Sequence, residues 1–154
     1  MKIGGIVENR NLTLYRMIAV PDKPGEAGSI LKFFAKKNIT LQYITESSTD
    51  TDSAVMAICV DENDTEKIDN YLAKHKKIVA PMEVKKTDNV SVLGIYGPHF
   101  KQKPALSALF CVVLGSAGVN ILGLSSSISS ICGVIKDKQV DKAKKVLLKT
   151  FELP

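Results

Sequence analysis

Residues 20–41 read VPDKPGEAGSILKFFAKKNITL, and this stretch decides the fold because its pattern occurs twice in the chain. The apolar run before it is typical of a strand, and the two prolines and the glycine of residues 21–25 predict a turn. Apolar residues then follow at positions 27, 30, 31 and 34, with lysines on the opposite face, which is helical spacing. The helix ends before residues 39–45, which predict the next strand.

The same pattern recurs 80 positions later, where residues 104–121 read PALSALFCVVLGSAGVNI. The shift needs no gap: Pro24 falls on Pro104, and Asn38 falls on Gly118. Self-similarity at a long period indicates duplicated units that pack around a shared core, so two units of about 70 residues each are predicted.

Each unit is predicted to run strand, helix, strand, strand, helix, strand. The predicted fold class is α+β, with two ferredoxin-like βαββαβ units in tandem. The predicted strands are residues 14–20, 39–45, 54–60, 78–84, 90–96, 119–124 and 128–135. The predicted helices start after Gly25, at a capping box of Asn63 and Glu66, at Pro104 and near Val140.

The second unit lacks a last strand after its final helix. We expect the apolar segment of residues 3–7 to supply it, which makes the first unit an insertion in the second. The predicted boundaries are residues 11–87 for the first unit, and residues 1–10 plus 88–154 for the second.

Composition and charge exclude several classes of protein. The chain has 154 residues, 45 % of them hydrophobic, which is enough for a core without disulfides or metal. The net charge is +5, but the densest basic stretch, residues 136–149, has no aromatic residue on which a base could stack. We therefore expect a solvated helix face there and no nucleic-acid partner.

The cysteines and histidines give no metal or redox signal. Cys59, Cys111 and Cys132 form no CxxC pair, and neither histidine has metal-ligand spacing with them, so no cofactor and no metal are expected. The N-terminus meets a charge too early for a signal peptide, and the longest apolar run, residues 108–114, is too short to span a membrane. We expect a cytoplasmic protein with no membrane partner.

Four segments carry a resemblance to a known family. The loop Val20–Ala27 resembles the ligand loop of ACT domains, the amino-acid-sensing modules of metabolic enzymes. The other segments are the entry residues 5–14, the start of the second unit at 90–94, and residues 118–121 leading to the serines 125–127. In this order they resemble the paired ACT regulatory region of aspartokinases, over nearly the whole chain.

The resemblance implies that the two modules bind a free amino acid and set the activity of a kinase. In that family the effectors are end products of the aspartate pathway, chiefly lysine and threonine. Asp22 matches the acidic residue that holds the ligand's ammonium, and Asn120 and Ile121 match positions that contact the ligand. Ser125 belongs to the serine-rich strand of the site, and Glu46 stands where many members carry glutamine.

The chemistry of the first loop agrees with this expectation. A zwitterion needs an anion, which Asp22 supplies, and donors for its carboxylate. The backbone N–H groups of Glu26, Ala27 and Gly28 are predicted to lie unpaired at the positive end of a helix, and Gly25 lets the backbone approach closely. From the residues alone, a plain turn residue is the commoner explanation of Asp22; the resemblance reverses that order.

The two halves are predicted to bind unequally. The second loop, residues 94–105, carries no Asp-Lys-Pro-Gly, and Ile128 stands where the family's strand has glutamate. We therefore predict one ligand site per chain, between the 20–28 loop and the strand of Asn120 and Ile121. If Glu46 faces the ligand's side chain it favours a cation, which ranks lysine above threonine.

The predicted helix 104–117 is apolar on both faces, since Ala108, Cys111 and Val112 lie opposite its core stripe. A helix that is apolar all round is expected to be buried all round, against the first unit or in a homodimer, which is how this family usually assembles. A chain of 154 residues that starts with Met leaves no room for a kinase domain. The expected partners are therefore a small amino acid, a second copy and a kinase catalytic subunit or domain.

Two alternatives stay open at this point. Besides the regulatory region, the sequence is compatible with a stand-alone ACT sensor of another amino acid and with a small enzyme that acts on an amino acid. The enzyme needs a nucleophile or an acid–base pair, for which the sequence offers only Glu46 and scattered serines.

Overall fold

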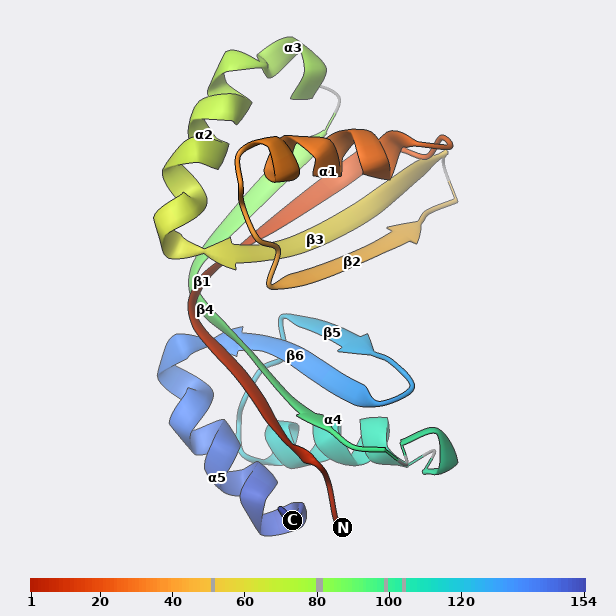
Figure 1. The fold of residues 1–154 in the computed structure, drawn as a ribbon, viewed down its shortest axis with the longest axis vertical. Coiled ribbons are helices and arrows are strands. Elements are labelled where there is room, and N and C mark those ends of the chain that lie inside the picture. Colours follow the sequence, from red (N-terminus) through yellow and green to blue (C-terminus); the bar gives the residue numbers. More distant parts are fainter. Residues whose placement is uncertain (51, 80–81, 99, 104) are drawn as a thin grey trace. The chain divides into compact units, whose positions relative to one another are not determined.

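The computed structural model describes residues 1–50, 52–79, 82–98, 100–103 and 105–154 (Figure 1). The strands are β1 Gly5–Pro21, β2 Tyr43–Ser48, β3 Ser53–Asp61, β4 Glu83–Tyr96, β5 Gly123–Ser126 and β6 Ser130–Lys136. The α-helices are α1 Glu26–Lys36, α2 Thr65–Lys74, α3 Lys76–Val79, α4 Leu106–Ser116 and α5 Val140–Thr150. Short 3-10 helices are η1 Glu62–Asp64, η2 Phe100–Gln102 and η3 Asp137–Gln139.

The chain divides into two compact units. We call residues 12–88 the inserted unit, and residues 1–11 with 89–154 the split unit. Hydrogen-bonded neighbours follow the order β2-β3-β1-β4 in the inserted unit and β1-β4-β6-β5 in the split unit. In both orders the unit's last strand lies beside its first, as in a ferredoxin-like fold, and the predicted fold class is confirmed.

Strands β1 and β4 each run through both units, where the sequence predicted separate strands at 3–7 and 14–20. Each has one residue with a left-handed backbone where it leaves one unit and enters the other: Asn11 with φ 59° and Asn89 with φ 55°. Asparagine tolerates this conformation better than most residues, so neither strand needs a glycine there.

Helices α1 and α2 cover one face of the strands of the inserted unit, and α4 and α5 cover one face of the strands of the split unit (Figure 1). In the inserted unit the core contains the fully buried Met56 and Ile58, with Phe34 from α1 and Ile68 from α2. The split unit repeats this arrangement, and its core includes Leu93, Phe110, Leu114, Ile135 and Leu147. The apolar helix stripes read from the sequence are therefore the faces that pack.

The turn after the first helix of each unit has the same geometry. Asn38 and Gly118 both have left-handed backbones, with φ 55° and 74°. The next residue in each case donates back into its helix: Ile39 N–H to Phe34 at 2.9 Å, and Val119 N–H to Leu114 at 3.0 Å. The predicted 80-residue repeat is therefore present in the backbone.

Several element boundaries differ from the prediction. Strands β2 and β5 begin four residues later than expected, at Tyr43 and Gly123, because the segments after the left-handed residues run extended before they pair. No capping box forms at Asn63: its N–H donates to the Asp61 side chain at 2.9 Å, and η1 precedes α2. Residues 76–79 are helical rather than extended. Residues 80, 81 and 104, on which other predictions fall, lie outside the described residues.

Within the split unit the second apolar face of α4 is only partly covered, and Cys111 is its half-buried member. Burial of this face against the first unit or in a homodimer stays a prediction. Ala108 is exposed, and the side chain of Val112 is 61 % exposed. Exposure of this face to water costs little free energy, because most of its residues are small and present little apolar area. Among the described residues, no helix is long and apolar enough to cross a membrane.

Candidate functional site

The loop between β1 and α1 has the backbone that the sequence predicted for it. Gly25 caps α1 with φ 87° and ψ −8°, a left-handed conformation that strains any side chain. Its carbonyl accepts hydrogen bonds from the N–H and the hydroxyl of Ser29, at 2.9 and 3.1 Å. Among the described residues, no heavy atom lies within 4 Å of where a Cβ on Gly25 or Gly28 would be, so the first turn of α1 is open on this side.

One of the three predicted backbone donors is already in use. The N–H of Glu26 donates to the carbonyl of Lys23 at 3.1 Å, so the prediction that it is unpaired is wrong. The reason is local: proline followed by a left-handed glycine makes a type II turn, whose first carbonyl faces the N–H three residues later. The donors that remain to a ligand are those of Ala27 and Gly28, which have no acceptor one turn back in α1.

Asp22 follows the last residue of β1 and is exposed. Its N–H donates to the carbonyl of Asp52 at 3.1 Å, which ties the loop to the residue before β3. The carboxylate therefore stands at the outer surface of the inserted unit, on a backbone that is anchored at both ends.

Glu46 lies on the helix-covered face of the inserted unit. It is directly opposite Met56 of β3, and directly opposed residues of an antiparallel pair point to the same side. Met56 is fully buried in the core under the helices, whereas Glu46 is exposed at the edge strand. Two residues further along, Ser48 and Val20 both stand opposite Ala54, so Glu46 and the ligand loop belong to the same end of the sheet.

The other three predicted residues belong to the split unit. Asn120 is exposed, and Ile121 is half-buried against the split-unit core. Ser125 is half-buried and stands opposite Cys132, while its neighbour Ser126 stands opposite the core residue Ile131. Ser125 thus points away from the helix-covered face. The structure brings six predicted residues together in the inserted unit and three in the split unit.

The loop of the split unit that corresponds to the ligand loop is folded differently. It contains η2, and Phe100 is buried in the split-unit core. A Cβ on Gly97 would lie 2.8 Å from the Phe100 ring. Helix α4 begins after Ala105, whose φ of −80° is ordinary, instead of after a left-handed glycine. An aromatic side chain therefore fills this loop where the inserted unit leaves an open helix turn.

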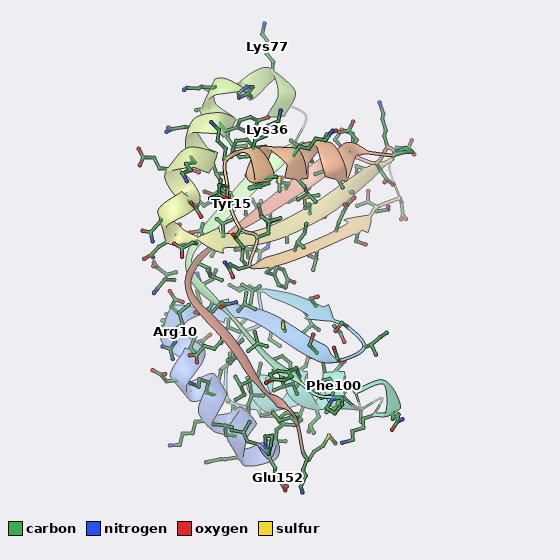
Figure 2. All side chains as sticks on the ribbon, viewed as in Figure 1. Arg10, Tyr15, Lys36, Lys77, Phe100 and Glu152 are labelled. Carbon is green, nitrogen blue, oxygen red and sulfur yellow. The ribbon has the colours of Figure 1, made fainter. Side chains whose placement is uncertain are left out.

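A charged cluster in the inserted unit was missed by the sequence analysis. The Tyr15 hydroxyl donates to one oxygen of Asp69 at 2.8 Å, and the Lys86 ammonium donates to the other at 2.8 Å. Tyr15 is labelled in Figure 2. Burial raises the pKa of Tyr15, and so does its bond to Asp69. The same carboxylate raises the pKa of Lys86. Positions so far apart in the chain give no local signal, so only the fold could reveal the cluster.

A cavity of about 80 Å³ lies in the core of the inserted unit, between α1, α2 and the strands. Its walls are almost entirely apolar, from residues such as Met17, Ile30, Phe33 and Leu72. An amino acid needs partners for an ammonium and a carboxylate, and an apolar lining offers none. The cavity is therefore not the candidate amino-acid site.

The thiols of Cys59 and Cys132 are poor nucleophiles. Burial raises the pKa of Cys59 to about 12 and also raises the pKa of Cys132. A thiol that stays protonated at neutral pH does not attack a substrate. No group of three or more His, Cys, Asp or Glu side chains within the described part of the chain is placed to hold a metal ion.

Comparison with known proteins gives a consistent result. Residues 17–79 match the ACT domain family. The aspartokinase of Mycolicibacterium smegmatis is 24 % identical over 152 residues, which cover 97 % of this chain and 36 % of that protein. The aspartate kinase of Pseudomonas putida is 24 % identical over 151 residues, covering 98 % of this chain and 37 % of that protein. The chain thus spans about a third of the length of the curated relatives it matches.

Solved structures share the fold along the whole chain. The ligand-free regulatory subunit of aspartate kinase from Thermus thermophilus aligns with a TM-score of 0.83 at 19 % identity, covering 99 % of this chain and 100 % of that one. Aspartate kinase from Synechocystis aligns with a TM-score of 0.86 at 21 % identity, covering 96 % of this chain and 26 % of that one. The resemblance read from the sequence is confirmed: along nearly its whole length this chain is similar to about a third of the aspartokinases and to solved regulatory subunits of aspartate kinase.

Proposed function

We propose that this chain is an allosteric regulator that binds a free amino acid and controls an aspartokinase catalytic subunit or domain. The observation that carries the proposal is the loop of the inserted unit, where a left-handed Gly25 and an exposed Asp22 flank the open first turn of α1. The similarity to the regulatory part of aspartokinases supports the same function.

In the proposed site, different groups bind the ammonium and the carboxylate of the zwitterion. Asp22 pairs with the ligand's ammonium, and the N–H groups of Ala27 and Gly28 donate to its carboxylate. The positive end of the α1 dipole favours the negative charge at that position by about 0.3–1 kcal/mol. Asn120, Ile121 and Ser125 are proposed ligand contacts as well, on the resemblance stated above.

A thermal-shift screen of the twenty amino acids, at low and at high salt, tests the function. One or two strong stabilising ligands that persist at high salt are expected, because the contacts are short and local. Asp22→Asn should remove the shift while leaving the melting temperature without ligand unchanged, since the carboxylate is exposed. No stabilising amino acid would contradict the proposal, and hits that vanish with salt would indicate nonspecific charge binding.

Glu46 is the proposed determinant of side-chain preference. Its position on the helix-covered face, at the end of the sheet that carries the loop, supports this role. A carboxylate there favours a cationic side chain by about 1–3 kcal/mol net, as for other hydrogen bonds to charged groups. We therefore propose lysine over threonine as effector. Titrations of both with the unmodified protein and with Glu46→Gln decide it: an unchanged preference in the variant means that Glu46 does not read the side chain.

We further propose one site per chain. Phe100 fills the loop that would form the second site, and α4 has no left-handed glycine before it. Calorimetric titration should give one ligand per chain, and two equal sites would contradict this.

The proposed partner in assembly is a second copy, through the exposed apolar face of α4. Val112, with 61 % of its side chain exposed, is the largest residue of that face. Val112→Glu should weaken the dimer, because a charge would be buried in an apolar contact. Sedimentation that finds a monomer of the unmodified protein at micromolar concentration would overturn the proposal.

A further inference from the structure

A second hollow, of about 250 Å³, lies on the outside of the inserted unit, away from the proposed amino-acid loop. Its lining residues are Lys37, Lys67, Asn70, Tyr71, Lys74 and His75. All but Lys37 come from α2 and its C-cap, and the spacing of three and four residues places positions 67, 70, 71 and 74 on one face of that helix. Lys37, the C-cap of α1, closes the hollow from the other helix.

Several positive charges surround the hollow. Three of its six lining residues are lysines, and Lys36, Lys76 and Lys77 flank it in the chain. Lys36 and Lys77 are labelled in Figure 2. The segment 70–79 contains no aspartate or glutamate. Within the part of the chain that the structure describes, the one ion pair of a lining residue joins Lys67 to Asp64 at 3.4 Å, and such a pair contributes little because the Lys67 side chain is half-exposed. Charges of one sign around a concavity attract a counter-ion.

An aromatic stack holds the polar end of the hollow rigid. The ring centroids of Phe33 and Tyr71 lie 3.9 Å apart in a stacked pair, and those of Tyr71 and His75 lie 4.1 Å apart in a second stacked pair. The Nδ1 of His75 lies 2.9 Å from the carbonyl oxygen of Tyr71. A carbonyl can only accept, so Nδ1 carries the proton and Nε2 is the ring atom left for another partner.

Complementing the helix dipoles does not explain all of these cations. Both α1 and α2 end at the hollow, where lysines stabilise the negative end of a helix. Lys67, however, is the third residue of α2, at the positive end of the dipole, where a cation is disfavoured. The C-terminal carbonyls of Phe33 and Tyr71 already accept the N–H groups of Lys37 and His75, at 3.1 and 3.0 Å. These two carbonyls therefore already have donors of their own.

We propose that this hollow binds the phosphate group of a small anionic ligand, at a site separate from the amino-acid loop. Phosphate carries more than one charge and three acceptor oxygens, so it can satisfy several ammonium groups at once, which a single carboxylate cannot. Lys37, Lys67 and Lys74 supply the charge, and Asn70 supplies an amide donor. The volume leaves room for a phosphate together with a second phosphate or a short organic group.

Calorimetric titration of the whole chain at low ionic strength tests the proposal, with inorganic phosphate, pyrophosphate and adenosine monophosphate as probes. At least one probe should bind. The order of their affinities distinguishes a site for free phosphate from a site for an organic phosphate. Lys74→Gln and Lys37→Gln should each weaken that binding by roughly tenfold, the range for one charged hydrogen bond. Because both lysines are exposed, circular dichroism should be unchanged.

The split unit offers a matched control. A shift of 75 positions aligns α2 with α5 and places Lys149 where Lys74 stands, but with Val146 and Thr150 in place of Tyr71 and His75. Lys149→Gln removes the same charge and should change phosphate binding less than about twofold. Equal losses in Lys74→Gln and Lys149→Gln, or no binding of any probe at millimolar concentration, would overturn the proposal. The amino-acid response should be the same in all three variants, which keeps this test independent of the proposed effector site.

Discussion

The two units join their last strand to their second helix with ion pairs of opposite polarity. In the inserted unit, Lys86 on β4 donates to Asp69 on α2 at 2.8 Å. In the split unit, Glu8 on β1 accepts from Lys144 on α5 at 2.9 Å. The shift of 75 that aligns the two helices places Asp69 on Lys144, and the shift of 78 that aligns Asn11 with Asn89 places Glu8 on Lys86.

The last strand and the second helix of each unit therefore carry opposite charges at this pair of positions, and either element can carry the negative one. The polarity also matches each strand segment to its own helix. Exchanged segments would set Lys86 against Lys144 and Glu8 against Asp69, and like charges repel. In a chain whose β1 and β4 each serve both units, the two pairs therefore favour the correct assignment of strands.

The units differ most in their first loops. The inserted unit has a left-handed Gly25 and an open helix turn, whereas the split unit has Phe100 packed into its own core. The backbones are otherwise closely repeated, down to the left-handed residues Asn38 and Gly118. The two halves thus share the scaffold, and the inserted unit differs by the open helix turn at this loop.

The largest expected effect separates the two cores. Phe110 is fully buried, while the equivalent Ile30 is half-buried beside the apolar cavity. Phe110→Ala should lower the free energy of unfolding by about 3–5 kcal/mol, and Ile30→Ala by about 1–2 kcal/mol. The loss is smaller at Ile30 because folding removes less apolar area from water there. Urea unfolding followed by circular dichroism measures both. Equal losses would mean that the two cores are packed alike.

The next effect concerns the left-handed turn that both units share. Gly118→Ala should cost about 1–2 kcal/mol, since alanine is strained at φ 74°. Gly118→Asn should cost less, because Asn38 already occupies the equivalent position with φ 55°.

Gly115, in the last turn of α4 before this turn, is the matched control, because no described atom lies within 4 Å of a Cβ there and its φ is not positive. Gly115→Ala should stabilise the protein by about 0.5–1 kcal/mol. If Gly118→Ala and Gly118→Asn cost the same, the turn does not depend on backbone conformation in the way the repeat suggests.

The limits of sequence analysis follow from the same positions. The turn at Gly25 was predictable because proline and glycine act through local backbone geometry. The bond from Glu26 N–H to Lys23 was not foreseen, since the first helical turn was treated apart from the turn before it. The single long β1 was missed because Asn11 reads as a break in a strand.

Contacts between distant segments were beyond reach for a different reason. Tyr15, Asp69 and Lys86 come together only once the strand order is known. The basic hollow was likewise hidden, because its charge depends on Lys37 and Lys74 meeting at the ends of two helices. Local pattern thus predicted the repeat and the loop, and the fold alone revealed the charged clusters.

A smaller effect is expected when Lys86 is replaced, either by the neutral Gln or by Glu, the residue type of the equivalent Glu8 in the split unit. Lys86→Gln should lower the free energy of unfolding by up to about 1 kcal/mol, the usual contribution of a partly exposed pair. Lys86→Glu should cost more, since the new carboxylate faces Asp69 and Asp88. Adding Asp69→Lys should recover part of the loss by restoring opposite charges. A double variant no better than Lys86→Glu would show that the polarity is fixed by other neighbours.

The smallest effect is a difference between the two pairs in their dependence on pH. The hydrogen bond from Lys144, followed by that from Arg10, lowers the pKa of Glu8 below its ordinary 4.5. A carboxyl whose pKa is lower in the folded state stabilises the fold above pH 4.5 and loses this contribution as the pH falls through the folded pKa. The hydrogen bond to Asp69 raises the pKa of Lys86 above 10.5. That contribution is present below pH 10.5 and is lost as the pH rises through the folded pKa.

The Glu8–Lys144 pair should therefore stop stabilising the fold in acid, and the Lys86–Asp69 pair should stop stabilising it in alkali. Urea unfolding at neutral pH, below pH 4.5 and above pH 10.5 tests this with the unmodified protein, Glu8→Gln and Lys86→Gln. The stability gap between the unmodified protein and Glu8→Gln should shrink on the acid side, and the gap to Lys86→Gln should shrink on the alkaline side. The raised pKa of Tyr15 also lowers stability in alkali, because unfolding frees its hydroxyl to ionise. This loss is present in the unmodified protein and in Lys86→Gln, so the comparison uses the difference between the two proteins. A gap to Glu8→Gln that stays constant into acid would mean that the ionised carboxylate contributes nothing, and that the opposite polarity of the two pairs has no energetic consequence.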